Sequence, residues 1–63
     1  MFKCEINTDT PAFKNPKGVG DDDFNKRVEI TRILREVEMN IAKGLNGGNI
    51  MDITGNNVGF WEI

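Results

Sequence analysis

Apolar and polar positions follow three different patterns along the chain. From Phe2 to Asn7 they alternate strictly, which is typical of a half-buried β-strand. The segment from Thr8 to Gly20 holds two prolines and two glycines among polar residues, and it predicts an irregular loop. From about Asp22 to Lys43 the apolar residues recur every three or four positions, which predicts one long helix.

The predicted helix carries apolar residues on two sides. Its main stripe follows helical spacing and consists of Ile30, Ile33, Leu34, Val37, Ile41 and Leu45. A weaker second stripe collects Phe24, Val28 and Met39, with Arg32 and Arg35 beside it. One small sheet covers only one face of a helix. The second stripe is therefore either ordinary surface or a contact with a partner subunit, and we favour the contact.

The segment from Asn49 to Ile63 predicts a β-hairpin, because residues 54–57 are all turn formers. We expect Gly55 and Asn56 to form a two-residue type II′ turn, so that Ile53 faces Val58 and Met51 faces Phe60. The opposite face then holds the remaining residues of the hairpin, Ile50, Asp52, Gly59, Trp61 and Ile63. Since one helix cannot cover two apolar faces, the face with Trp61 needs a subunit, a ligand or the folded loop as its cover.

These elements define a single α+β domain, residues 1–63, with an N-terminal strand, a long loop, one helix and a C-terminal hairpin. The strands are expected to form a small antiparallel sheet with the helix on one face. A chain this short buries only about 60% of its unfolded surface. Cys4 has no second cysteine to pair with, and the lack of histidine argues against structural zinc. We therefore expect stability from a homo-oligomer, a dimer or higher.

Composition narrows the function classes. The net charge of −2 argues against electrostatic binding to nucleic acid. No apolar run approaches the roughly 20 residues of a membrane span. The first residues lack the apolar core of a signal peptide, so a cytoplasmic location is expected.

Catalytic chemistry has few residues to use. The chain has no histidine, tyrosine or serine, and Cys4 lies on the apolar face of a predicted strand, where a thiol is usually inert. Asp21, Asp22 and Asp23 are interpreted as a helix cap rather than a metal cluster. We therefore expect a binding protein, with no enzymatic activity, cofactor or metal.

Several residues are candidates for ligand contacts. Phe13 is the one aromatic residue of the loop, and it either plugs the loop onto the core or stacks on a ligand. Arg32 and Arg35 lie on a rigid helix, where guanidinium groups form forked bonds to phosphate. The basic loop around Lys14 and Lys17 is a weaker candidate for an anion site.

Three segments resemble a group of short phage and prophage proteins: INTDTPAF at 6–13, ITRILREV at 30–37 and MDITGNNVGFW at 51–61. The pattern of that group runs I-x-T-x-N-A-A-F, then A-R-I-L-R-E, a glycine-rich break, and D-I-N-G-N-x-V-G-x-W. Thr10, Pro11 and Thr54 depart from it, so the loop and the turn are where this chain differs from the group.

Small phage proteins of similar size include sponges that sequester the nucleotide signal of a bacterial immune system such as Thoeris, whose signals are cyclic ADP-ribose isomers. The resemblance implies such a role in the host cytoplasm, with the nucleotide held between subunits. In this hypothesis the ligand is held by six residues: Arg32 and Arg35 for the phosphates, Phe13 and Trp61 for the adenine, and Asn56 or Asn57 for the riboses.

Two other hypotheses stay open. In the first of these, the chain is an inhibitor or adaptor that binds a host or phage protein through the hairpin face around Ile50, Trp61 and Ile63. Alternatively, its helix arginines bind nucleic acid, which the sequence pI near 4.9 opposes.

Overall fold

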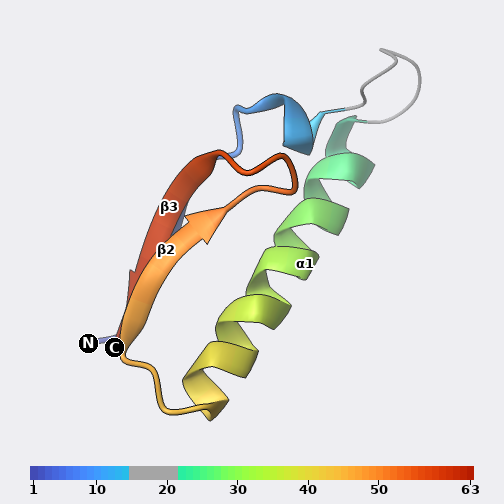
Figure 1. Cartoon of the computed structure of the whole chain (residues 1–63). Helices are drawn as coiled ribbons and strands as arrows, with labels where there is room; N and C mark the ends of the chain where they lie inside the picture. The colour runs from blue at the N-terminus through green and yellow to red at the C-terminus, as the bar shows by residue number, and fades with distance from the viewer. Residues whose placement is uncertain (15–21) are drawn as a thin grey trace.

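The computed structural model describes residues 1–14 and 22–63, except for the side chains of residues 22 and 23 (Figure 1). Its elements, in chain order, are strand β1 (Lys3–Ile6), the short 3-10 helix η1 (Pro11–Phe13), helix α1 (Asp22–Ala42), and strands β2 (Gly47–Met51) and β3 (Asn57–Glu62). This order confirms the α+β fold expected from the sequence. The predicted cap at residues 21–23 and the loop cations beyond Lys14 lie outside the described residues.

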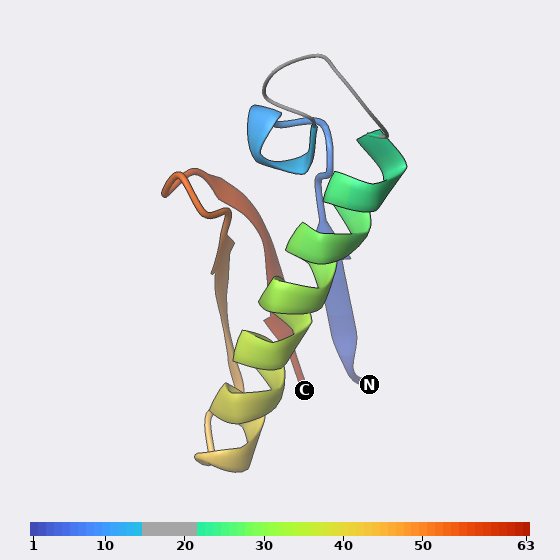
Figure 2. The same ribbon diagram turned by 90° about the vertical axis from the view of Figure 1, so that its right-hand side faces the viewer.

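The three strands form one antiparallel sheet in the order β1-β3-β2, so that β3 is the central strand. Helix α1 lies across one face of this sheet, and the two chain ends lie close together at one end of it (Figures 1 and 2). The short helix η1 packs against α1. The loop between β1 and α1 therefore returns to the core before α1 begins.

Glycine ends α1 in the expected way. Gly44 has a φ of 97°, a conformation that favours a residue without a side chain. The amide of Gly44 donates to the carbonyl of Ile41, and the amide of Leu45 donates to the carbonyl of Asn40. This pair of bonds is a Schellman motif, which satisfies the last carbonyls of the helix and turns the chain toward β2.

The hairpin register predicted from the sequence was wrong by two residues. Asn49 pairs with Phe60 and Ile50 pairs with Gly59, instead of Met51 with Phe60. The turn lies earlier in the chain than the type II′ turn predicted at Gly55 and Asn56, because the amide of Gly55 donates to the carbonyl of Asp52 at 3.0 Å. Gly55 has a φ of 91°, as the last residue of a three-residue loop with a glycine bulge requires.

The covered face of the sheet also differs from the prediction. Trp61 pairs with Cys4 and Gly48 on the face under α1, and its exposed fraction is only 2%. The face with Trp61 therefore needs no subunit or ligand as its cover. Met51 and Ile53, which we expected under the helix, are exposed. An irregularity of the register between Ile50 and Met51 also changes the direction in which the side chains after Ile50 point.

The core consists of six buried apolar side chains from every part of the chain except β1: Phe13, Ile33, Val37, Ile50, Val58 and Trp61. Phe13 is completely buried, which confirms that it plugs the loop onto the core. Ile33 and Val37 confirm the centre of the main helix stripe, whereas Leu34, Ile41 and Leu45 are exposed. The helix presents a narrower face to the sheet than its sequence indicated.

Gly59 is the position in β3 at which a side chain would be tolerated least. A Cβ atom at Gly59 would overlap with the backbone carbonyl of Glu5, because β1 and β3 approach closely there. We expect Gly59→Ala to lower the free energy of unfolding by about 2–3 kcal/mol, as overpacking in a rigid site does. Urea denaturation followed by the fluorescence of the single tryptophan measures this change.

Gly48→Ala is the matched control, because a Cβ there meets the Trp61 side chain at 3.3 Å rather than backbone. We expect the control to lose much less stability than Gly59→Ala. Equal stabilities for the two variants would contradict the close approach of β1 to β3.

Candidate functional site

The hairpin turn is organised by the buried carboxylate of Asp52. Its Oδ1 accepts from the Thr54 amide at 2.9 Å, the Thr54 hydroxyl at 2.6 Å and the Asn56 amide at 2.9 Å. Its Oδ2 accepts from the hydroxyl of Thr10 at 3.0 Å, which ties the turn to the N-terminal loop. These bonds to the ionised form, led by the Thr54 hydroxyl, lower the pKa of Asp52 to about 2.

A second buried carboxylate joins the turn to α1. Oε2 of Glu29 accepts from the Ile53 amide at 2.8 Å and from Nη2 of Arg32 at 3.0 Å, and Oε1 accepts from Nε of Arg32 at 2.7 Å. The hydrogen bonds with Arg32 are the main cause that lowers the pKa of Glu29 below its ordinary value of 4.5. We refer to Glu29, Arg32 and the Ile53 amide as the helix–turn clamp.

Arg32 uses four of its N–H donors in this arrangement. Besides Glu29, it donates from Nη1 to Glu36 at 2.9 Å and from Nη2 to the carbonyl of Met51 at 3.2 Å. A guanidinium group has only five N–H donors. The role predicted for Arg32, binding phosphate, would compete with bonds that fasten the helix to the hairpin.

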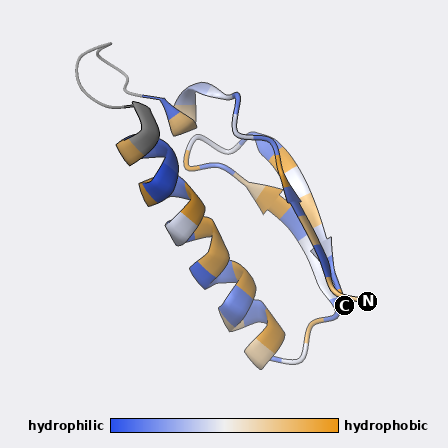
Figure 3. Ribbon diagram, turned by 180° about the vertical axis from the view of Figure 1, so that it is seen from behind, coloured by the Kyte–Doolittle hydropathy of each residue, from blue (hydrophilic) through white to orange (hydrophobic). Residues whose placement is uncertain are grey.

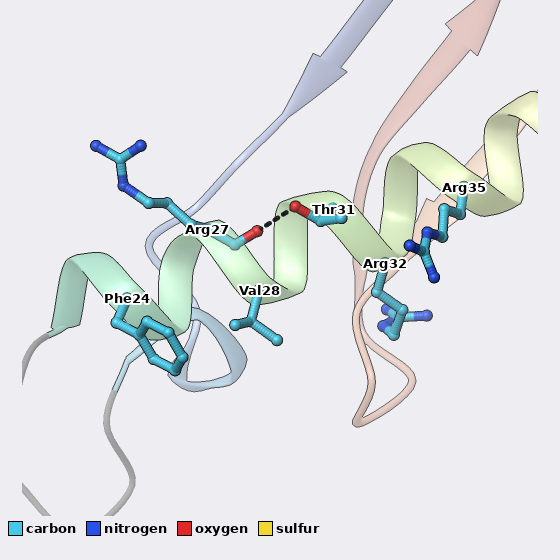
Figure 4. Close-up of a pocket in the computed structure, with 6 residues that line it drawn as sticks. All are labelled: Phe24, Arg27, Val28, Thr31, Arg32 and Arg35. Atoms are coloured by element: carbon cyan, nitrogen blue, oxygen red, sulfur yellow. Dashed lines mark hydrogen bonds between the residues drawn. The ribbon is translucent and has the colours of Figure 1, made fainter.

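An open groove of about 470 Å³ lies on the outer side of α1. It lies between two rows of side chains on successive turns of the helix and is lined by Phe24, Arg27, Val28, Thr31, Arg32 and Arg35. Figure 4 shows Phe24 and Val28 on the same side of the helix, with Arg27 extending away from them. The hydroxyl of Thr31 donates to the carbonyl of Arg27 at 2.8 Å.

The groove combines apolar and cationic surface. Phe24 is 65% exposed and Val28 is 53% exposed, so two neighbouring large apolar side chains are in contact with solvent. Arg35 is exposed and forms no ion pair with any residue that the structure describes. The groove therefore offers a planar aromatic ring and a guanidinium group to the same ligand.

The six residues predicted to hold a nucleotide are not assembled into one site. Only Arg32 and Arg35 share the groove. Phe13 and Trp61 are buried in the core, so neither ring is exposed for stacking. Asn56 and Asn57 are exposed in the hairpin, where the Asn56 amide group donates to Thr54 and Oδ1 of Asn57 accepts from the Gly59 amide. The hairpin face around Ile50 and Trp61 is likewise unavailable to a protein partner.

The residues missing from the predicted site are Phe24, Arg27, Val28 and Thr31. Phe24 and Val28 could have been found from the sequence, because they belong to the second apolar stripe beside Arg32 and Arg35. Nothing in the sequence distinguishes that stripe from Phe13 or Trp61 as the apolar part of a site. That choice depends on which aromatic rings the core takes up.

Two findings limit the kinds of site. Within residues 1–14 and 22–63, no three side chains among Cys, Asp, Glu and His come together as a metal site. In the same residues, no helix has both the length and the apolar character needed to cross a membrane.

No family model matches the chain, and no curated protein or solved structure matches it either. The resemblance to short phage proteins therefore stays a prediction.

The two carboxylates predict how stability depends on pH. Both have folded pKa values below their ordinary values, so their contribution is complete above the ordinary values and is lost as the pH falls. We expect the free energy of unfolding to decrease between about pH 4.5 and about pH 2, as measured by urea denaturation at a series of pH values.

Asp52→Asn tests the origin of this dependence. The variant cannot ionise at residue 52, so its stability should change less with pH over the lower part of the range, from pH 3.8 to about 2. An identical pH dependence in the variant and in the original protein would show that Asp52 is not the titrating group.

Proposed function

We propose that the protein is a non-catalytic binding protein that holds a small anionic ligand in the groove on α1, and that this ligand is a nucleotide. The observation that supports the proposal is the common exposure of Phe24 and Arg35 in one groove of about 470 Å³. This volume lies within the range of about 300–1,000 Å³ that small-molecule sites occupy.

Each part of a nucleotide has a counterpart in the groove. The phosphates would accept forked hydrogen bonds from Arg35, with Arg27, which lies eight residues earlier on the helix, as a second cation. The base would lie against Phe24 and Val28, where an apolar planar group gains from leaving water. Arg32 would stay paired with Glu29 and Glu36, so Arg35 and Arg27 carry the contacts with the phosphates.

The resemblance to short phage proteins suggests the purpose of such binding. A protein that captures a host immune signal, such as a cyclic ADP-ribose isomer, needs affinity and no catalytic group. The ligand contacts differ from those expected from the sequence, because Phe24 takes the place of Phe13 and Trp61.

A second candidate function is the inhibition of a host or phage protein through the same side of α1. It is supported by the exposure of five large apolar side chains along that helix, which are Phe24, Val28, Leu34, Met39 and Ile41. Such a row is suited to a protein surface with a hydrophobic centre. Recovery of one host protein in a stoichiometric complex that Val28→Glu abolishes would favour this candidate.

Calorimetric titration with ADP-ribose and cyclic ADP-ribose tests the nucleotide proposal. We expect Arg35→Ala to weaken binding about tenfold or more, because a hydrogen bond to a charged group contributes about 1.5–3 kcal/mol. Lys43→Ala is the control, since Lys43 is an exposed cation that lies just beyond the end of α1 and outside the groove.

The result for the control decides what a loss of affinity means. Equal losses in Arg35→Ala and Lys43→Ala would indicate attraction to overall charge and would contradict the groove as the site. No binding of either nucleotide to the original protein would reject this ligand class and leave a protein target as the remaining candidate.

A further inference from the structure

The buried residues of α1 and a series of its exposed residues lie on opposite sides of the helix. The side chains buried against the sheet are Glu29, Ile33 and Val37. The opposite side contains a series with alternating spacings of four and three residues, all of them exposed: Phe24, Val28, Thr31, Arg35, Glu38 and Ala42. This alternation is the spacing that two helices need in order to pack along a common seam.

Apolar side chains border this seam on both edges. Met39 lies on one edge, and Leu34 and Ile41 lie on the other, and all three are exposed. Together with Phe24 and Val28, the seam and its edges thus include every large apolar side chain of α1 that is exposed. Figure 3 shows that hydrophobic segments recur along the whole length of α1.

The distribution of charge identifies the occupant of this surface. Arg27 is near the start of the seam and Glu38 is near its end, and both are exposed. A second copy of α1 in antiparallel orientation would place Glu38 of one copy beside Arg27 of the other, twice in each pair. The same arrangement sets Phe24 against Ala42, Val28 against Glu38 and Thr31 against Arg35. The charges of Arg27 and Glu38 thus complement each other across a two-fold axis, as a symmetric interface requires.

The other exposed surfaces are less suited to a second copy. The outer face of the sheet surrounds the half-buried ring of Phe60 with Lys3, Glu5 and Glu62. The edge strand β1 carries two of these charges, and charged residues on an edge strand oppose pairing with another strand.

We propose that the protein forms a homodimer in which the outer sides of two antiparallel α1 helices pack together around a two-fold axis near the middle of the helix. The seam includes four of the residues that line the groove, Phe24, Val28, Thr31 and Arg35, so a second copy and a ligand would compete for this side of α1. The dimer is inferred from the surface of α1 alone and does not rest on the proposed function.

Sedimentation equilibrium on the full chain, without any nucleotide, tests the dimer. We expect the original protein to be dimeric, and Arg27→Glu and Glu38→Arg each to weaken the dimer about tenfold or more, because each change places like charges together at two positions. The double variant carrying both changes should recover the dissociation constant of the original protein. Both positions are exposed, so the monomer fold is expected to persist.

Lys14→Glu and Glu62→Arg are the matched controls, since they make the same charge changes at exposed positions away from α1. They should leave the dimer unchanged. A monomer at several hundred micromolar, or a dimer that the single variants do not weaken, would overturn the proposal. Failure of the double variant to recover the dimer would exclude the antiparallel pairing of Arg27 with Glu38. None of these outcomes depends on nucleotide binding.

Discussion

The contact on which the structure depends most is the hydrogen bond between the buried carboxylate of Glu29 and the amide of Ile53. It joins the middle of α1 to the tip of the hairpin, two parts of the chain that are 24 residues apart. Arg32 neutralises the same carboxylate and also reaches the carbonyl of Met51. The clamp therefore fixes both the position of the helix along the sheet and the side of the helix that faces it.

A buried carboxylate is costly unless hydrogen bonds and a counter-charge compensate for the loss of water. Glu29 has both, whereas Asp52 is compensated by hydrogen bonds alone, and no buried side-chain polar atom of the described residues lacks a partner. The two carboxylates hold the turn through its backbone amides, a role that apolar side chains cannot take. Once the helix is fixed in this way, Phe24, Val28 and Arg35 remain on the outside, where they form the groove.

The helix and the order of the elements along the chain could be predicted because they depend on regular spacing of apolar residues. The helix was expected from Asp22 to Lys43 and is found from Asp22 to Ala42. The hairpin register could not be predicted from that spacing, since it is set by the side chain of Asp52, which accepts from Thr54 and Asn56. Counting apolar residues placed Met51 under the helix, whereas the polar residues Glu29 and Asp52 occupy the interior there.

The spacing of apolar residues likewise predicted only part of the candidate site. The sequence identified Arg35 and the stripe of Phe24 and Val28, because helical spacing places them on one side of α1. It could not show that Phe13 and Trp61 are buried in the core, since an aromatic residue in a loop or a strand serves packing and binding equally well. Burial made that distinction, and it required the folded chain.

We infer that the side of α1 turned away from the sheet is the binding surface of the protein. Amide NMR spectra recorded over a dilution series from millimolar to micromolar concentration test this inference. We expect concentration-dependent shifts at Phe24, Val28, Arg35 and Met39, with little change in β2 and β3. Shifts confined to the outer face of the sheet, around Phe60, would contradict it.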